Sequence, residues 1–450
     1  MRQAMRRRDQ RPTVAPAPRW RFGLPRTSWL DNGLEVLICH RPGQHIASVC
    51  LSLDIPLNSE PRDIEGVATI TQRCLDEGTL QHPGISFSEA LEDIGAVLDG
   101  SVGLSASQLF LDVPTAALPQ ALLLLAEAVS SPELAESHVE RHRELRLADI
   151  AQTFASSSRS AQVAFRKACL PRRFRASRMA GGSASRVARV TVEDVRAFHA
   201  THYRPEGATL IITADLTAEV YAWVDAAFSG WQVPGTVTPQ HPTLEPRAPH
   251  RWLIDRPGAV QADLRLGALG IDRTDPRWAD LQVATYAVGG AFLSRLNRVL
   301  REERGFTYGV HLTNQPMRSS GLLAVQGSFR TEVVGEAVQL AAQLINITEH
   351  ALTETEVSEA VRYYTGSSPL RYSTAAGVTQ NLAALVAAGV SADFIDANAY
   401  ALTQVTPASA TEALAGLLPP DRLTLVAVGS AEELTRPLND IGWPVTEHSL

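Results

Sequence analysis

The sequence repeats itself at one fixed offset. The segment TLII at 209–212 resembles TLVA at 424–427, and the two are 215 residues apart (424 − 209 = 215). The Val-Thr pairs that end at Thr191 and Thr406, and the alternating apolar segments that contain Val49 and Leu264, stand at the same offset. Internal similarity at a fixed period indicates that one structural unit occurs more than once. The chain is therefore expected to fold as two similar halves.

A proline-rich segment separates these halves. Residues 234–250 read PGTVTPQHPTLEPRAPH, and such composition is typical of a domain boundary. We expect a first domain at 30–233 and a second at 251–450. Residues 1–29 begin with an arginine- and proline-rich stretch that lacks the apolar core of a secretory signal, so a disordered arm is expected there.

Each half mixes the two hydrophobic periods. In the first half, alternating β-branched and apolar residues predict strands at 34–39, 46–53 and 210–214, and a hairpin at 96–113. Helices are expected at 66–75, after Ser86, at 119–129, at 132–152 behind Ser131, and after Thr191. Ser86 with Glu89 and Thr191 with Asp194 have the spacing of capping boxes. Helices over one mostly antiparallel sheet give an α+β fold in each half.

Composition excludes several classes of protein. A chain of 450 residues is long enough for two or three domains. The apolar fraction of 45% and charged fraction of 20% are those of an ordinary soluble protein, and a net charge of -7 gives no reason to expect nucleic acid. No apolar run approaches the ~20 residues that span a bilayer. Four scattered cysteines without CxxC spacing predict reduced, mostly buried thiols and a cytoplasmic protein.

One stretch, LREERGFTYGV at 300–310, has the residues of a catalytic site. Arg301 offers a permanently charged fork of donors, and Tyr308 offers one hydroxyl. If the chain turns at Gly305, the two side chains could converge on one carbonyl oxygen, as in an oxyanion hole. Spacing alone favours a simpler alternative, a charged helix end followed by a tyrosine in a strand.

Four stretches resemble the pitrilysin-type peptidases, peptidase family M16, which include insulin-degrading enzyme and mitochondrial processing peptidase. They are LDNGLEVLI (30–38), GVATITQRCLDEGT (66–79), FHATHYRPEGATLIITADL (198–216) and LREERGFTYGV. The similarity extends from about residue 25 to 440, and the last motif is the most specific. The resemblance implies the LuxS/MPP-like metallohydrolase fold in both halves.

The resemblance also identifies a degenerate zinc site. In the family the second stretch carries HxxEH on a helix, where two histidines bind zinc and the glutamate acts on the bound water. Here Thr69 and Arg73 replace the histidines and Gln72 replaces the glutamate. The family's third ligand, a glutamate 76 positions further on, corresponds to Asp149 (73 + 76 = 149). We expect a salt bridge between Arg73 and Asp149 and no catalytic metal in this chain.

A second pair of histidines needs to be weighed. His138 and His142 stand at i and i+4, but Glu140 at i+2 points to another face of a helix, so neither HExxH nor HxxEH is formed. A solvated, charged helix face is the favoured interpretation. The least favoured hypothesis is an autonomous peptidase with His138, His142 and Asp149 as metal ligands.

A cationic run follows later in the first half. It could steer an acidic substrate or a partner subunit, but a mobile, solvated loop is the favoured interpretation. Its arginines are Arg172, Arg173, Arg175, Arg178, Arg186 and Arg189.

The resemblance implies a division of labour. Some family members pair a subunit that keeps HxxEH with one that keeps only the arginine and the tyrosine. The sequence therefore predicts a heterodimer with an HxxEH-bearing paralogue, which supplies zinc and base, while Arg301 and Tyr308 bind the carbonyl of an extended peptide added to a sheet edge. The chain alone would be inactive. The alternative is an inert structural subunit, like the core proteins of respiratory complex III.

Overall fold

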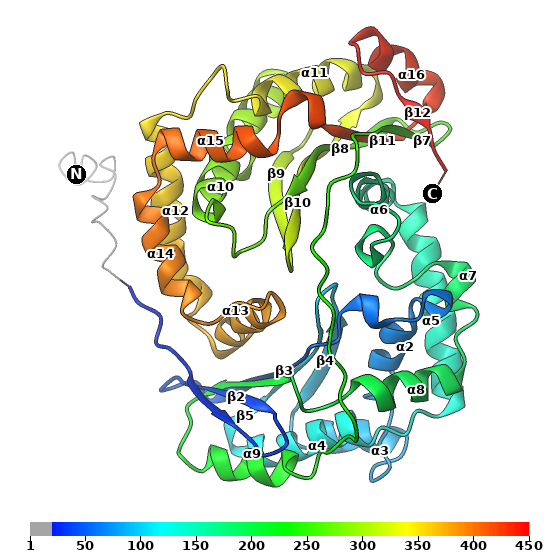
Figure 1. Ribbon diagram of the computed structural model, residues 1–450, viewed down its shortest axis with the longest axis vertical. Helices are drawn as coiled ribbons and strands as arrows, with labels where there is room; N and C mark the ends of the chain where they lie inside the picture. The colour runs from blue at the N-terminus through cyan, green and yellow to red at the C-terminus, as the bar shows by residue number, and fades with distance from the viewer. Residues whose placement is uncertain (1–19, 450) are drawn as a thin grey trace, which may run out of the picture.

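The computed structural model describes residues 20–449, which form two halves joined by an extended segment (Figure 1). The strands of the first half are β1 (Arg26–Trp29), β2 (Glu35–His40), β3 (Ile46–Leu53), β4 (Val97–Val102), β5 (Ser107–Pro114) and β6 (Thr209–Ala214). Its α-helices are α2 (Val67–Arg73), α3 (Ile85–Asp93), α4 (Leu118–Ser130), α5 (Glu136–Ala155), α6 (Ser157–Cys169), α7 (Ala184–Val187), α8 (Val192–His202) and α9 (Val220–Phe228). Short 3-10 turns are η1 (Leu57–Ser59), η2 (Arg62–Ile64), η3 (Thr115–Ala117) and η4 (Arg175–Ser177).

The second half repeats this order of elements. Its strands are β7 (Arg251–Asp255), β8 (Gln261–Gly270), β9 (Val310–Met317), β10 (Ser320–Arg330), β11 (Thr424–Gly429) and β12 (Thr446–Glu447). Its α-helices are α10 (Trp278–Thr285), α11 (Val334–Ile345), α12 (Glu354–Arg371), α13 (Ala375–Ala387), α14 (Phe394–Gln404), α15 (Pro407–Leu417) and α16 (Ala431–Asp440). The π-helical turns are η5 (Tyr286–Gly290) and η6 (Asn297–Glu303), and the 3-10 turns are η7 (Thr331–Val333) and η8 (Pro420–Arg422).

Each half contains one six-stranded mixed sheet flanked by helices. The strand orders are β1-β2-β6-β3-β5-β4 and β12-β7-β11-β8-β10-β9. In the first sheet β6 pairs in parallel with β2 and antiparallel with β3, and in the second β11 does the same with β7 and β8. The two tandem α+β domains with mostly antiparallel sheets are therefore confirmed.

Equivalent elements of the two halves stand 215 residues apart, at the offset found in the sequence. β6 begins at Thr209 and β11 at Thr424, and every residue of both strands is buried. Thr191 and Thr406 cap α8 and α15, each with a reciprocal capping box. The same local signals therefore start the same elements in both halves.

Each sheet has one face covered by a helix from the other half. Along β3, Val49 and Leu51 face the core of the first half, whereas Cys50 faces α13 of the second half. Along β11, Leu425 faces its own core, whereas Val426 packs with residues of α6 from the first half. Successive side chains of a strand point to opposite faces, so strands such as β3 and β11 that are covered on both faces are mostly apolar. In Figure 1, α13 lies over the first sheet and α6 lies under β11.

The amino-terminal part of the first sheet begins earlier than expected. Of the arm expected at 1–29, residues 1–19 lie outside the described part of the chain. Residues 26–29, however, form β1, which pairs antiparallel with β2. The Phe22 side chain is 3% exposed, and its ring centroid lies 5.0 Å from that of Tyr372 in the second half. Aromatic packing and strand pairing thus order the segment from residue 20 onward.

Two expected helix starts are wrong. Ser86 lies inside α3 and its hydroxyl donates to the carbonyl of Pro83, so it does not cap the helix, which begins after Gly84. Ser131 does not open the long helix either, because α5 starts at Glu136. Between Ser131 and Glu136 the chain is not helical: the amide of Glu133 donates to the carbonyl of Gly78 at 2.9 Å, and Leu134 has a φ of +46°.

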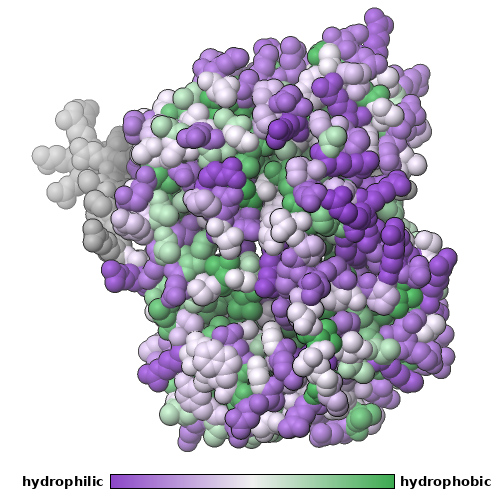
Figure 2. Space-filling view, in the orientation of Figure 1, coloured by the Kyte–Doolittle hydropathy of each residue, from purple (hydrophilic) through white to green (hydrophobic). Residues whose placement is uncertain are grey.

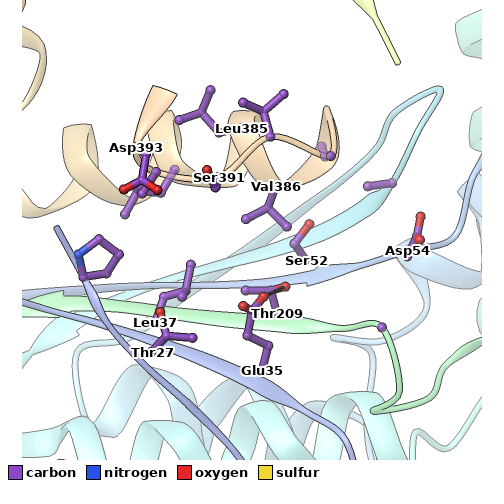
Figure 3. Close-up of a pocket in the computed structure, with 18 of the residues that line it drawn as sticks. Thr27, Glu35, Leu37, Ser52, Asp54, Thr209, Leu385, Val386, Ser391 and Asp393 are labelled. Carbon is purple, nitrogen blue, oxygen red and sulfur yellow. Dashed lines mark hydrogen bonds between the residues drawn. The ribbon is translucent and has the colours of Figure 1, made fainter. Parts of the chain in front are cut away.

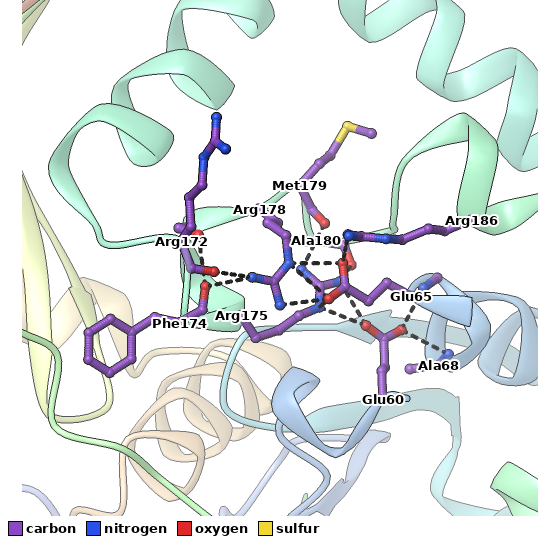
Figure 4. A network of polar contacts seen from close by, with 12 residues as sticks. Glu60, Glu65, Ala68, Arg172, Phe174, Arg175, Arg178, Met179, Ala180 and Arg186 are labelled. Atoms are coloured by element: carbon purple, nitrogen blue, oxygen red, sulfur yellow. Dashed lines mark hydrogen bonds and ion pairs between the residues drawn. The ribbon is translucent and has the colours of Figure 1, made fainter. Parts of the chain in front are cut away.

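The expectation of a solvated arginine loop is wrong for three of its six arginines, Arg175, Arg178 and Arg186. Arg175 is 5% exposed, and its guanidinium donates twice to one carboxylate oxygen of Glu60, at 2.7 and 2.9 Å (Figure 4). Arg178 and Arg186 both form ion pairs with the buried Glu65. Burial raises the pKa of Glu60, and the nearby Arg175 together with backbone amides opposes that shift. Arg175, Arg178 and Arg186 thus form a network with Glu60 and Glu65 that fixes the chain leading into α2. The other three arginines of the run, Arg172, Arg173 and Arg189, are exposed as expected.

The four cysteines agree with the sequence prediction. Cys39, Cys50, Cys74 and Cys169 are free and buried, and burial raises the pKa of the Cys39 thiol to about 11. Separately, no helix between residues 20 and 449 is both long and apolar enough to cross a bilayer.

Candidate functional site

The stretch at 300–310 leaves the π-helical turn η6 and enters an edge strand. Gly305 has a φ of +63°, in the left-handed region that glycine adopts without strain. Across this turn the amide of Phe306 donates to the carbonyl of Leu300 at 2.9 Å. The expected turn at Gly305 is therefore present. Tyr308 stands two residues before β9, which begins at Val310, and not inside the strand.

The Arg301 side chain is held over an aromatic ring. Its guanidinium carbon lies 4.0 Å from the ring centroid of Phe292, and Nη2 lies 2.9 Å from Oε1 of Glu302. A cation over an aromatic face is attracted by the ring, by about 0.5–1 kcal/mol at an exposed site. The ion pair with Glu302 is partly exposed, with a side-chain exposure of 25% for Arg301 and 46% for Glu302, so it adds little. The arginine is oriented without being buried.

Tyr308 is presented to solvent. The residue is 95% exposed, and within residues 20–449 its hydroxyl has no hydrogen-bonding partner and no bond to Arg301. The neighbouring backbone is nevertheless fixed, because Thr307 Oγ1 donates to the carbonyl of Ser328 at 2.6 Å. The convergence of Arg301 and Tyr308 on one acceptor therefore stays a prediction.

Two side chains that the sequence analysis missed anchor this loop. Asn297 is 2% exposed, and its Oδ1 accepts from the amide of Val310 at 3.0 Å. Arg295 makes a two-point contact with Glu356, at 2.6 and 2.7 Å. Bonds from Arg295 and Thr353 lower the pKa of Glu356 to about 2, against the effect of burial. Only the Thr353–Glu356 capping box could be read from the sequence.

The positions of the family's zinc ligands carry an ion pair instead. Arg73 Nη2 lies 2.8 Å from Asp149 Oδ2, which confirms the expected salt bridge. Gln72 is 7% exposed and lies against β4, where a Cβ on Gly100 would be 1.5 Å from its Nε2. Thr69 lies half-buried on the same helix, α2.

These residues do not fit a zinc ion. Arg146 Nη1 also approaches Asp149, at 3.9 Å, so two permanent cations face one carboxylate. A hydroxyl, an amide and a guanidinium replace two imidazoles and a carboxylate, and zinc sites need deprotonated nitrogen, sulfur or oxygen ligands. Within the described part of the chain, no group of three or more His, Cys, Asp or Glu side chains is placed to hold a metal ion.

In the second histidine pair, His142 is committed to another contact. His142 is 9% exposed, and its Nε2 lies 2.6 Å from Glu77 Oε1. Arg141 forms an ion pair with the same carboxylate, and Asp149 is held by Arg73. The set His138, His142 and Asp149 is therefore not a ligand group, and the solvated-face interpretation is wrong for His142.

Two family models match most of the chain. The model described as Insulinase (Peptidase family M16) matches residues 35–169, and the one described as Peptidase M16 inactive domain matches residues 189–364. Together they include the degenerate zinc positions and the Arg/Tyr stretch. The chain belongs to peptidase family M16.

Known relatives are similar over most of their length. An uncharacterized zinc protease of Streptomyces coelicolor is 24% identical over 360 residues, 78% of this chain and 77% of the relative. A peptidase M16 inactive domain from Pseudomonas fluorescens superposes with a TM-score of 0.82 at 23% identity, over 90% of this chain and 98% of that one. A chain of complex III2 from Candida albicans gives 0.77 at 13% identity, over 92% and 99%. The two superpositions establish a shared fold.

Proposed function

We propose that this chain is the non-zinc-binding subunit of a heteromeric M16-type metallopeptidase. The observation that carries the proposal is the contrast between its two candidate sites. Arg73 and Asp149 close the zinc position with an ion pair at 2.8 Å, while Tyr308 is 95% exposed on an ordered loop. An exposed tyrosine on an ordered loop, seven residues after an oriented arginine, suits a ligand that comes from outside the chain.

In this proposal Arg301 and Tyr308 bind the carbonyl oxygen of the scissile peptide. Their donors stabilise the negative charge that develops on that oxygen, and a preorganised donor is worth about 10²–10³ in rate. The HxxEH-bearing partner supplies the zinc-bound hydroxide and the base. Phe292 and Glu302 limit the orientations of Arg301, so that the side chain loses less conformational entropy when the substrate binds.

The sheet edges support an extended peptide as substrate. β9 is the last strand of the second sheet and, among residues 20–449, pairs with no strand other than β10, so this edge could accept a further strand beyond Val310, whose amide is bonded to Asn297. Tyr308 stands two residues before this strand. β4 is the matching edge of the first sheet and lies against α2. A peptide added to such an edge uses main-chain hydrogen bonds for affinity.

The test is peptide cleavage by an HxxEH-bearing relative from the same genome, with and without this chain. The assay includes Tyr308→Phe, Arg301→Gln and two matched controls, Tyr400→Phe and Arg436→Gln, which alter exposed residues elsewhere. We expect the chain alone to be inert and the mixture to cleave. Tyr308→Phe and Arg301→Gln should each lower kcat by about 10²–10³, while the controls leave it unchanged.

Two results would contradict the proposal. If the relative is as active alone as in the mixture, no second subunit is needed. If Tyr308→Phe has the same activity as Tyr400→Phe, the tyrosine has no part in catalysis.

The second candidate is a structural subunit without catalytic function. One observation favours it: Arg301 already has partners within the chain, Phe292 and Glu302. The likeness to a chain of complex III2 supports the same reading at the level of fold. Tyr308→Phe distinguishes the two candidates. It lowers the rate of peptide cleavage if the tyrosine takes part in catalysis, and it has no effect on that rate if the subunit is structural.

A cytoplasmic location is part of this proposal. Its support is the state of the four cysteines, which are free and buried, as expected where thiols stay reduced.

A further inference from the structure

A cavity of about 500 Å³ lies between the two halves of the chain. Its floor is formed by the first sheet, and its roof by the carboxyl-terminal end of α13 and the segment that leads to Asp393 (Figure 3). Ligand pockets in proteins usually measure about 300–1,000 Å³. Neither Arg301 nor Tyr308 lines the cavity. It is therefore a separate feature, independent of the proposed catalytic role.

The upper wall is aliphatic. Leu382, Leu385 and Val386 of α13 line the cavity from above, and Leu37 of β2 faces them from the sheet. In the space-filling view, hydrophobic residues gather on this side of the molecule around α13 (Figure 2). Such a wall favours the hydrocarbon part of a ligand.

Three carboxylates also line the cavity, and one of them is neutralised. Asp54 Oδ1 lies 3.3 Å from Arg318 Nη1 and 2.8 Å from His241 Nε2. Asp54 comes from the first half, His241 from the linker and Arg318 from the second half. This contact joins the halves at one end of the cavity and leaves no net negative charge there.

The other two carboxylates have no cationic partner among residues 20–449. Glu35 Oε2 accepts one hydrogen bond, from Thr209 Oγ1 at 2.9 Å. Asp393 precedes α14 and its side chain makes no capping bond. Figure 3 places Glu35 on the sheet side of the cavity and Asp393 on the helix side. The cavity thus carries an excess of negative charge at two points on opposite walls.

The end of α13 adds to this field. Ala387, the last residue of the helix, lines the cavity. The carboxyl terminus of a helix carries a partial negative charge, and cations near it are stabilised by about 0.3–1 kcal/mol. The amino terminus of α14 begins next to Asp393 and carries the opposite partial charge. The preference for a cation therefore rests on the two carboxylates.

We propose that this cavity binds an ammonium or guanidinium group carried on a short alkyl chain. The cation would balance Glu35 and Asp393, and the alkyl part would pack on Leu385 and Val386. An anion would be repelled by both carboxylates, and a neutral hydrocarbon would leave them without a partner. The same chemistry is offered by a free alkylamine and by an arginine or lysine side chain of a peptide.

The test is calorimetric titration of the full chain with n-hexylammonium and with a blocked tetrapeptide that contains one arginine. Neutral 1-hexanol and anionic hexanoate are the matched ligands. We expect n-hexylammonium, the peptide or both to bind, and to bind at least tenfold more tightly than 1-hexanol or hexanoate. The double variant Glu35→Gln/Asp393→Asn should weaken the binding at least tenfold. The control Glu432→Gln, an exposed carboxylate on α16, should leave it unchanged.

The ligands that bind identify the source of the cation. Binding of the peptide alone assigns the site to a peptide side chain, and binding of the amine alone assigns it to a free amine. Titrations are repeated on the chain without residues 1–19, whose arginines carry the same chemistry. The proposal is overturned if neither cation binds either form, if 1-hexanol binds equally well, or if the double variant, with an unchanged unfolding temperature, binds as before.

Discussion

The helix α2 of the first half and the loop at 300–310 of the second half are the two candidate regions, and they are opposite in character. On α2, the residues at the family's zinc-site positions make contacts within the chain: Gln72 lies against Gly100, and Arg73 is paired with Asp149. On the loop, Tyr308 is 95% exposed and has no partner among the described residues. The first region has been converted into internal structure. The second presents its groups outward, which is the arrangement that a site shared with another subunit requires.

The largest expected effect concerns the buried network that leads into α2. Glu60→Gln leaves Arg175 without its main counter-charge, at a site where the Arg175 and Glu60 side chains are 4% and 0% exposed. An uncompensated buried charge costs about 3–5 kcal/mol. Urea unfolding of the variant should show this loss in the free energy of unfolding. A loss below about 1 kcal/mol would mean that the first region is not held by this network.

A matched pair of variants sharpens the result. Glu60→Leu combined with Arg175→Met removes both charges, so it should cost less than Glu60→Gln alone. Glu332→Ala breaks an exposed pair with Arg330, with side-chain exposures of 61% and 52%, and should cost less than about 0.5 kcal/mol.

The next effect is a pH dependence in the second region. The pKa of Glu356 is lowered to about 2 by Arg295 and Thr353. A carboxyl with a depressed folded-state pKa stabilises the fold above its unfolded pKa, and this stability is lost as the pH falls from about 4.5 towards 2. Glu356→Gln should therefore lose less stability between pH 7 and pH 3 than the parent chain does, by on the order of 1 kcal/mol after solvent screening. If the free energies of unfolding of the variant and the parent change equally with pH, the ion pair between Arg295 and Glu356 does not stabilise the fold.

A smaller effect is expected at the degenerate zinc position. Arg73→Ala breaks a pair whose members are 36% and 41% exposed, so the free energy of unfolding should fall by no more than about 1 kcal/mol. Peptide cleavage by the mixture with the partner should not change. A large loss of cleavage would show that α2 still takes part in the reaction.

The smallest effect on stability is expected at Tyr308. Because the side chain is 95% exposed, Tyr308→Phe should change the free energy of unfolding by less than about 0.5 kcal/mol. Measured beside the cleavage assay, this separates a binding role from a structural one. Substantial destabilisation would show that the Tyr308 hydroxyl contributes to folding stability. The loop would then resemble α2 in serving the structure of the chain.

The sequence predicts those features that depend on local signals or on one long spacing. The 215-residue offset is visible because β6 and β11 are buried on both faces and have similar sequences, TLIITA and TLVAVG. The contact between Arg73 and Asp149 follows from a family spacing, since 76 residues separate them. The turn at Gly305 follows from glycine's freedom at positive φ.

What the sequence could not predict depends on partners far away along the chain. Arg175 looked solvated because Glu60, its partner, is 115 residues away and carries no local signal. Asn297 is inconspicuous in a run of charged residues, and only the fold shows that it holds the start of β9. The cover of each sheet by a helix of the other half involves residues far apart in the sequence, from Arg265 and Gln162 (265 − 162 = 103) to Thr379 and Ser48 (379 − 48 = 331).

Each half covers the sheet of the other half with one of its helices, α6 on the second sheet and α13 on the first. If the segment at 234–250 were cut, each half would still supply the helix that closes its neighbour's sheet. The duplicated polypeptide thus has the topology of a domain-swapped dimer whose two copies have been fused. Fusion replaces an encounter between molecules by one within a chain, at millimolar effective concentration. Neither half is a free-standing unit, because each on its own would expose an apolar sheet face.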